Sequence, residues 1–295
     1  MYIKELFNKK PVISLEIFPP KPTTPIASIY NTLEGLKNLK PDFISVTYGA
    51  SGTSKAYTVE IADIIKNKYH IEALAHLTCY NSTKEEINSI LKKLKEKNIE
   101  NILALRGDLP KDCDNHVFAD ADANLNHAND LVRLINSYGG FSIGGACYPE
   151  GNIDCKSTLE DLRNLKEKVS GGIDFLITQL FFDNEIFYSF KEKLDILGTS
   201  VPVSAGIMPV INKKQIERIT SMCGATLTPK FKRILYKYEH NPEALTEAGI
   251  AYATEQIIDL LSFGVDGIHL YTMNRPDVAR KIINDISNIR NCFAS

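Results

Sequence analysis

Eight short runs of apolar, often β-branched residues alternate with longer amphipathic stretches along this chain, and that alternation limits the fold more than any other feature. Several of the runs are almost continuously apolar, which is typical of parallel strands covered by helices. The runs are VISLEIF (12–18), DFISVTY (42–48), EALAHLTC (72–79), NILALR (101–106), SIGGACY (142–148), DFLITQL (174–180), VPVSAGI (201–207) and DGIHLYT (266–272).

The stretches between the runs carry helix patterns with recognisable start signals. Residues 83–98 predict a helix that begins with a capping box, made either by Ser82 and Glu85 or by Thr83 and Glu86. Residues 157–172 predict a second helix that begins with a capping box of Ser157 and Glu160 and ends at Gly171. The side chains expected on its buried face are Leu159, Leu162, Leu165 and Val169.

Eight β–α units in 295 residues favour a closed (β/α)8 TIM barrel, formed as a single domain by residues 1–295. The alternative is an open doubly wound sheet with fewer strands. No G-x-G-x-x-G follows the first run, so the usual sign of a dinucleotide-binding sheet is missing. Two long loops are expected, at residues 107–126 and at residues 208–265, the second with more than one helix. Barrels build their sites from such loops at the carboxyl ends of the strands.

Composition narrows the class of protein further. The chain has 34 basic and 36 acidic residues, a net charge of −2, so no basic excess points to nucleic acid or an anionic membrane. It has neither a signal-like start nor an apolar run of about 18 residues, which predicts a soluble, cytoplasmic protein. The six cysteines form no CxxC pair and the histidines do not cluster, so no metal site is expected.

Polar side chains stand at the ends of the predicted strands, where a barrel has its mouth. Glu16 lies inside the apolar run ISLEIF, and a buried carboxyl is costly unless it is paired or kept neutral. A neutral carboxyl suits a general acid, whereas pairing with an arginine or a backbone nest would make it structural. The other strand-end residues are Thr47, Tyr48, His76, Arg106, Asp108, Tyr148, Gln179, Asn274 and Arg275.

Several of these positions also have a purely structural interpretation. His76 between Ala75 and Leu77 is typical of a hydrogen-bonded core histidine. Arg106-Gly107-Asp108 is either a ligand-facing turn or a local ion pair. The residue pattern alone therefore predicts a barrel enzyme with an acid at its mouth. One helix face, formed by Asp161, Asn164 and Lys168, has the pattern of a solvated surface.

Taken together, the same segments resemble the flavin-dependent bacterial methylenetetrahydrofolate reductases, catalytic barrel only. The matches follow the family order and span nearly the whole chain. They are LEIFPPK (15–21), FISVTYGA (43–50), AHLTC (75–79), LALRGDLP (103–110), CYPE (147–150), DFLITQLFFD (174–183), GIMPV (206–210) and HLYTMNR (269–275).

The resemblance implies a (β/α)8 barrel that holds FAD and reduces 5,10-methylenetetrahydrofolate to 5-methyltetrahydrofolate, with NADH or NADPH as hydride donor in a ping-pong cycle. It implies that Glu16 is the general acid, that Asp108 lies beside flavin and pterin, and that Gln179, Arg275 and Thr47 contact substrate. The positions that match FAD-binding residues are Thr47, Tyr48, Ala50, His76, Arg106, Gly107, Asp108, Ala128, Tyr148, Asp161, Asn164 and Lys168.

The chain departs from the family pattern at four positions. Glu167 replaces a basic residue near the FAD phosphates, Asn152 replaces a histidine, and His127 takes an aromatic, phenolic position. These changes leave a less basic cofactor groove, so FMN is an alternative to FAD. Lys213 stands where the family has an aromatic residue that packs on nicotinamide and folate, which affects the choice of donor.

Two other functions remain open. The chain could be another FAD barrel oxidoreductase, of the proline dehydrogenase type. Substrate screening would distinguish that function from methylenetetrahydrofolate reduction. It could also be a flavin- or folate-binding subunit of a larger electron-transfer complex, in which a partner subunit supplies the electrons. A homo-oligomer is expected in either case, although no stripe on a predicted helix stands out as the interface.

Overall fold

The computed structural model describes residues 1–20, 24–48, 52–80, 82–107, 125 and 127–293. All eight predicted runs form strands, and the strands close into one parallel barrel in the order β1 to β8, which confirms the expected fold. The strands are β1 (Val12–Ile17), β2 (Phe43–Val46), β3 (Glu72–Thr78), β4 (Asn101–Leu105), β5 (Ser142–Cys147), β6 (Phe175–Thr178), β7 (Val203–Ile207) and β8 (Gly267–Tyr271).

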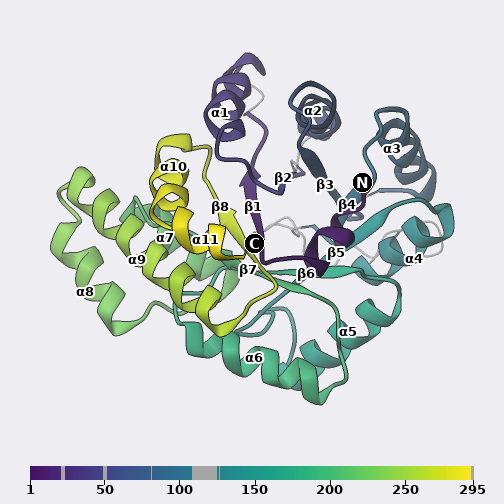
Figure 1. The fold of residues 1–295 in the computed structure, drawn as a ribbon. Helices are drawn as coiled ribbons and strands as arrows, with labels where there is room; N and C mark the ends of the chain where they lie inside the picture. The colour runs from purple at the N-terminus through teal and green to yellow at the C-terminus, as the bar shows by residue number, and fades with distance from the viewer. Residues whose placement is uncertain (21–23, 49–51, 81, 108–124, 126, 294–295) are drawn as a thin grey trace.

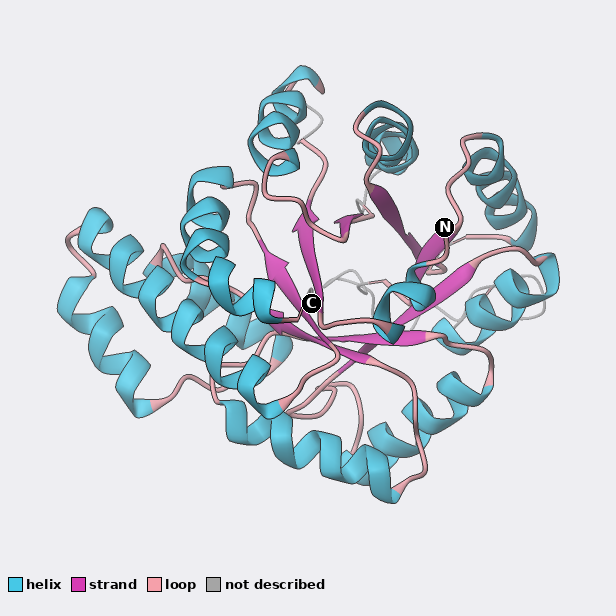
Figure 2. Ribbon diagram, in the orientation of Figure 1, coloured by secondary structure: helices cyan, strands magenta, loops and turns pink. Residues whose placement is uncertain are grey.

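Helices form a ring around these strands (Figure 1), and the sheet lies entirely inside that ring (Figure 2). Apolar helix faces pack on the outer side of the strands and bury one large core cluster. The helices are α1 (Ala27–Lys37), α2 (Gly52–Asp63), α3 (Lys84–Glu96), α4 (Ala128–Tyr138), α5 (Thr158–Ser170), α6 (Asn184–Ile196), α7 (Lys213–Cys223), α8 (Pro229–Tyr238), α9 (Pro242–Phe263), α10 (Pro276–Asp285) and α11 (Ser287–Cys292).

The predicted 208–265 insertion contains α7, α8 and α9, and α8 lies outside α9, away from the strands (Figure 1). The predicted 107–126 loop falls almost entirely on residues outside the described part of the chain. A short 3-10 helix, η1 (Ile3–Asn8), and a π-helical turn, η2 (Ile64–Lys68), complete the elements. Ile3 of η1 is fully buried against Phe43, Leu74 and Phe175, and this cluster fills the amino-terminal end of the barrel.

The ring closes between the first and the last strand. Ser14 of β1 pairs in register with His269 of β8, and Glu16 pairs with Tyr271. Side chains two residues apart on a strand lie on the same face, so Ser14 and Glu16 both point into the barrel. The fold thereby brings residues from opposite ends of the chain to one place.

Two expectations about helix starts and faces need correction. Helix α3 uses Thr83 and Glu86 as its capping box, so the Ser82 alternative is wrong. Ser157 does cap α5 by accepting the Glu160 N–H at 3.2 Å, but the Glu160 carboxylate accepts the N–H of Lys156 at 2.7 Å instead of closing a box. Leu159 is 55% exposed, because it lies in the first turn of α5, where the helix has not yet reached the sheet.

None of the helices in the described part of the chain combines the length and apolar character that a membrane crossing requires.

Candidate active site at the barrel mouth

The Glu16 carboxyl lies between two histidines near the carboxyl end of β1. Its Oε2 is 3.4 Å from Nε2 of His269 and 3.6 Å from Nε2 of His76. The Glu16 side chain keeps 17% of its surface exposed, whereas the two imidazoles are buried. No arginine approaches this carboxyl among the described ion pairs, so the expected arginine-paired alternative finds no support. Glu16 is thus a carboxyl that is largely buried yet reachable from the mouth.

His269 contacts a serine through Nδ1, the ring nitrogen that does not face Glu16. Its Nδ1 lies 2.7 Å from Oγ of Ser14, and that hydroxyl also lies 3.3 Å from the carbonyl oxygen of Ile268. A neutral imidazole has one donor and one acceptor nitrogen, and the serine hydroxyl can serve as partner to either. His269 can therefore face Glu16 with either a donor or an acceptor, according to the protonation state of the carboxyl.

His76 differs from the hydrogen-bonded core histidine that its neighbours in the sequence predict. It is 6% exposed, and among the described residues its Nε2 has no hydrogen-bond partner. Burial lowers its pKa from 6.5 to about 4, against the opposing effect of the Glu16 carboxylate. A buried nitrogen without a partner is unusual in a folded protein, and this one lies 3.6 Å from Oε2 of Glu16, beyond hydrogen-bonding distance.

A second group of candidate residues gathers beyond the ends of β4 and β5. We call Arg106, Tyr148, Asp161 and Lys168 the β4–β5 group. The Lys168 ammonium donates to the carbonyl oxygen of Ala146 at 2.5 Å, and burial lowers its pKa against the pull of the Asp161 carboxylate. Asp161 is itself 8% exposed, and burial raises its pKa. The prediction of a solvated helix face is therefore wrong for Asp161, and of the three only Asn164 is fully exposed.

The two tyrosines of the predicted site are half-buried phenols. Burial raises the pKa of Tyr148 to about 12, with a further contribution from the Asp161 carboxylate. Burial likewise raises the pKa of Tyr48 to about 12, and its ring packs against the main core cluster. Both side chains stay neutral at physiological pH and offer flat, partly apolar faces.

Arg106 follows β4 and forms an ion pair with Asp154 in the loop after β5. This pairing differs from the local ion pair with Asp108 that the sequence left open, and Asp108 lies outside the described residues. Gly107 has φ +93°, and a Cβ there would lie 3.1 Å from Cβ of Thr78. Only glycine takes that backbone angle without strain, so the chain passes close to β3 at this point.

The remaining predicted residues lie around the same rim. The backbone N–H of Thr47 donates to the carbonyl oxygen of Ile17 at 3.0 Å, and Ala128 is the first residue of α4. The side-chain oxygen of Gln179 accepts the N–H of the next residue at 2.9 Å. Arg275 is paired with Asp277 at 2.6 Å at the start of α10. Ala50, which the resemblance places at the cofactor, lies outside the described residues.

The four family departures have distinct places. Lys213 begins α7, is paired with Glu239, and lies over the ring of Tyr236. Asn152 lies in the β5–α5 loop, where its N–H donates to Asp161 at 3.1 Å. The N–H of His127, just before α4, donates to the Asp130 carboxylate at 3.0 Å.

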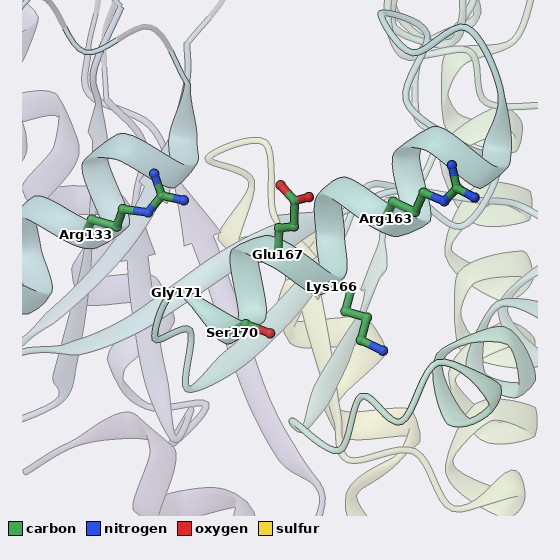
Figure 3. A pocket seen from close by; sticks show the side chains of 6 residues that line it. All are labelled: Arg133, Arg163, Lys166, Glu167, Ser170 and Gly171. Carbon is green, nitrogen blue, oxygen red and sulfur yellow. The ribbon is translucent and has the colours of Figure 1, made fainter.

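Glu167 faces outward, into a groove between α4 and α5 on the outer wall of the barrel (Figure 3). That groove has a volume of about 500 Å³ and is lined by Arg133, Arg163, Lys166, Glu167, Ser170 and Gly171. Arg163 and Lys166 are exposed, and no buried polar group is aimed into the groove, so we assign it no ligand.

Two side chains of the site make fewer polar contacts than they could. Among the described residues, Nε2 of His76 has no hydrogen-bond partner, and the Lys168 ammonium donates to one carbonyl oxygen. Within the described ranges no group of three or more histidine, cysteine, aspartate or glutamate side chains could hold a metal ion. A ligand with an anionic tail matches the β4–β5 group better than a cation does.

His269 is a site residue that the sequence analysis did not single out. It sits inside the apolar run DGIHLYT, where its neighbours give no sign of its partner. The signal that could have found it is the inward-facing alternation of β8, which places His269 opposite Ser14 once the ring is closed.

Comparison with known proteins gives a consistent result. A sequence model of the family described as methylenetetrahydrofolate reductase matches residues 2–287. A 5,10-methylenetetrahydrofolate reductase from Escherichia coli is 33% identical over 274 residues, covering 93% of this chain and 90% of the relative. Methylenetetrahydrofolate reductase (NADH) 1 from Arabidopsis thaliana is 35% identical over 272 residues, covering 88% of this chain and 46% of the relative.

This chain therefore spans nine-tenths of the length of the bacterial relative and about half the length of the plant one. Among solved structures, an uncharacterized protein from Clostridium thermocellum that binds two copies of 5-methyl-5,6,7,8-tetrahydrofolic acid matches with a TM-score of 0.69. The match covers 98% of each chain at 14% identity, which supports the barrel fold.

Proposed function

The chain belongs to the methylenetetrahydrofolate reductase family, and from that premise we propose that it reduces 5,10-methylenetetrahydrofolate to 5-methyltetrahydrofolate, with FAD as hydride carrier and NADH or NADPH as donor. The observation that carries the proposal is the Glu16 carboxyl, placed at the barrel mouth between His76 and His269. A ping-pong cycle would let the donor and the folate use the same space in turn.

Glu16 would act as the general acid. Opening the five-membered ring of the folate requires a proton on a ring nitrogen, and the Glu16 carboxyl, which is reachable from the mouth, would donate it. His269, supported by Ser14, would keep the carboxyl oriented in both protonation states. Asp108, which the family places beside the developing cation, would stabilise positive charge there.

The cofactor would lie along the rim from β2 to β5. A bound flavin would supply hydride transfer from the nicotinamide to the folate. Lys168 and Arg106 would meet its anionic tail, and His76 would contribute to the part of the site beside Glu16. The remaining contacts proposed for the cofactor are Thr47, Tyr48, Ala50, Gly107, Ala128, Tyr148, Asp161 and Asn164.

The substrate side of the proposal rests on Thr47, Gln179 and Arg275. Arg275 is paired with Asp277 on the exposed rim, where a folate carboxylate would compete for the guanidinium. The donor is left as NADH or NADPH. Three plant relatives carry NADH in their names, but Lys213 is paired with Glu239 where the family resemblance leads us to expect an aromatic residue.

An anaerobic visible spectrum of the FAD-supplemented protein tests the proposal. NADH should bleach the flavin band, and methylenetetrahydrofolate should then restore it. A second candidate function is a subunit that receives its electrons from a partner, and the observation behind it is the Lys213–Glu239 pairing. That candidate would be favoured if NADH cannot bleach the bound flavin but methylenetetrahydrofolate reoxidises the flavin after chemical reduction. Protein that binds no flavin would overturn both.

A further inference from the structure

An ion pair joins the ends of two neighbouring barrel strands across the β4–β5 group. Nη2 of Arg106, at the end of β4, contacts Oδ2 of Asp154, in the loop that follows β5. The two side chains are 31% and 48% exposed, so the pair lies at the open mouth and not in the core. The Arg106 guanidinium therefore has the Asp154 carboxylate as its counterion.

Asp154 is presented by a loop with its own internal bonding. Its N–H donates to Oδ1 of Asn152 at 3.0 Å, and the N–H of Asn152 donates to Oδ2 of buried Asp161 at 3.1 Å. Gly151, at φ +90°, donates its N–H to the carbonyl oxygen of Tyr148 at 3.0 Å. These bonds fix the backbone of Asp154, so its carboxylate stays beside the strand ends when the guanidinium turns away.

Arg106 is also fixed through its backbone, so only its side chain can move. Its carbonyl oxygen accepts the N–H of Tyr80 at 2.8 Å, which ties the end of β4 to the loop after β3. Among the residues that the structure describes, the side chain is ion-paired with one carboxylate, that of Asp154. The β4–β5 group therefore offers two cations to an approaching anion. Lys168 has a neutral partner, a carbonyl oxygen, whereas Arg106 has a charged partner, a carboxylate.

We propose that Asp154 competes with the phosphate groups of the flavin for the Arg106 guanidinium and thereby lowers the affinity of the protein for FMN and FAD. This inference rests on the proposed function, in which the β4–β5 group meets the anionic tail of the cofactor. When the cofactor binds, the guanidinium exchanges its carboxylate partner for a phosphate. The half-exposed Asp154 carboxylate is then hydrated by water. The exchange is reversible because exposed ion pairs of this kind are weak.

The competition makes a specific statement about ligand chemistry. Riboflavin carries no phosphate, so its binding does not require the Arg106–Asp154 pair to open. FMN and FAD both require it, and both also bring negative charge close to Asp154. Asp154 therefore acts against phosphate-bearing flavins and is indifferent to the ring system.

Titration of flavin fluorescence against apoprotein, with riboflavin, FMN and FAD in turn, tests the proposal. Asp154→Asn keeps the shape of the side chain and its place in the loop but removes the charge. It should lower the Kd for FMN and FAD about fivefold, equivalent to about 1 kcal/mol, and leave the riboflavin Kd unchanged. Glu255→Gln, which breaks an exposed ion pair between α8 and α9, is the matched control and should alter none of the three.

The double variant links the effect to Arg106. In an Arg106→Gln background, Asp154→Asn should lose most of its fivefold gain, because no guanidinium remains for the carboxylate to hold. If Asp154→Asn binds FAD with unchanged or weaker affinity, the competition is overturned and Asp154 is a positioning residue. The proposed function is still supported in that case, provided that the unaltered protein binds flavin. Flavin binding by neither protein would overturn the competition and the proposed function together.

Discussion

Nε2 of His269 and Oε2 of Glu16 lie 3.4 Å apart although 253 residues separate them in the chain. The imidazole is fully buried and held by Ser14, whereas the carboxyl reaches the mouth. The contact therefore connects a fixed interior group to an accessible acid. We propose that His269 is a positioning residue for Glu16, since its imidazole is fully buried and contacts that carboxyl.

Replacing Glu16 with glutamine should separate the two halves of the proposed reaction. Reoxidation of reduced flavin by methylenetetrahydrofolate should slow by about 10²- to 10⁴-fold, the usual contribution of a general acid, while reduction by NADH stays close to that of the unaltered protein. Stopped-flow absorbance follows each half separately. Glu192→Gln, on the exposed face of α6, should change neither. Loss of both halves in Glu16→Gln would show that Glu16 is structural.

Two equally buried serines should respond differently to alanine. Ser14→Ala leaves Nδ1 of His269 without its partner, so it should lower the free energy of unfolding by about 1–3 kcal/mol. Ser142 is just as buried, but its Oγ has no hydrogen-bond partner in the part of the chain that the structure describes, so Ser142→Ala should be neutral or slightly stabilising. Urea denaturation of both variants gives the comparison. Equal losses would mean that the Ser14–His269 contact contributes nothing to stability.

The unpartnered His76 should make stability depend on pH. Its pKa is about 4 in the folded protein, against 6.5 for an ordinary histidine. Below pH 6.5 His76 is therefore protonated in the unfolded chain but still neutral in the folded chain. Stability should therefore fall as the pH drops from about 6.5 to about 4, by up to about 3 kcal/mol from this group. The groups that face it are Glu16 and His269.

Urea titrations at several pH values, for the unaltered protein and for His76→Gln, isolate that contribution. The glutamine variant should lose part of the slope between pH 4 and 6.5, while the titration of the carboxylates remains common to both proteins. Parallel curves for the two proteins would refute a depressed pKa at His76.

Lys168→Ala should weaken retention of phosphate-bearing flavin without unfolding the barrel. Loss of a charge-assisted contact to a phosphate is worth about 1.5–3 kcal/mol, or roughly ten- to a hundredfold in Kd. Ultrafiltration measures the fraction of FAD that stays bound, and circular dichroism checks the fold. Lys166→Ala, exposed on the same helix, serves as control. Unchanged retention in Lys168→Ala would remove α5 from the cofactor site.

The strands could be predicted from the sequence because each one is a short apolar run whose two faces are both buried. All eight runs contain the strand that the structure forms. Helix faces were harder to predict, because a barrel helix has one polar end at the mouth. Asp161 is buried there and Leu159 is exposed, so the polar-out, apolar-in rule fails in the first turn of α5.

The contacts within the site could not be predicted, since they depend on which strand ends become neighbours. Arg106 has an acidic residue two positions away in the sequence, yet its partner is Asp154, on the loop after the next strand. His76 carries no sequence sign that its nitrogen lacks a partner. Family resemblance supplied residue roles for Glu16 and Lys168, but it did not supply the histidine that supports Glu16.

The pairing of β1 with β8 has a consequence for how the protein comes into being. A ribosome makes β1 first and β8 last, so Glu16 emerges long before His269 exists. Contacts this distant in sequence form late and slowly. A nascent or truncated chain that lacks β8 would carry the acid with one edge of its sheet open and no supporting imidazole. Closure of the ring and the contact between Glu16 and His269 therefore become possible together, once β8 has been made.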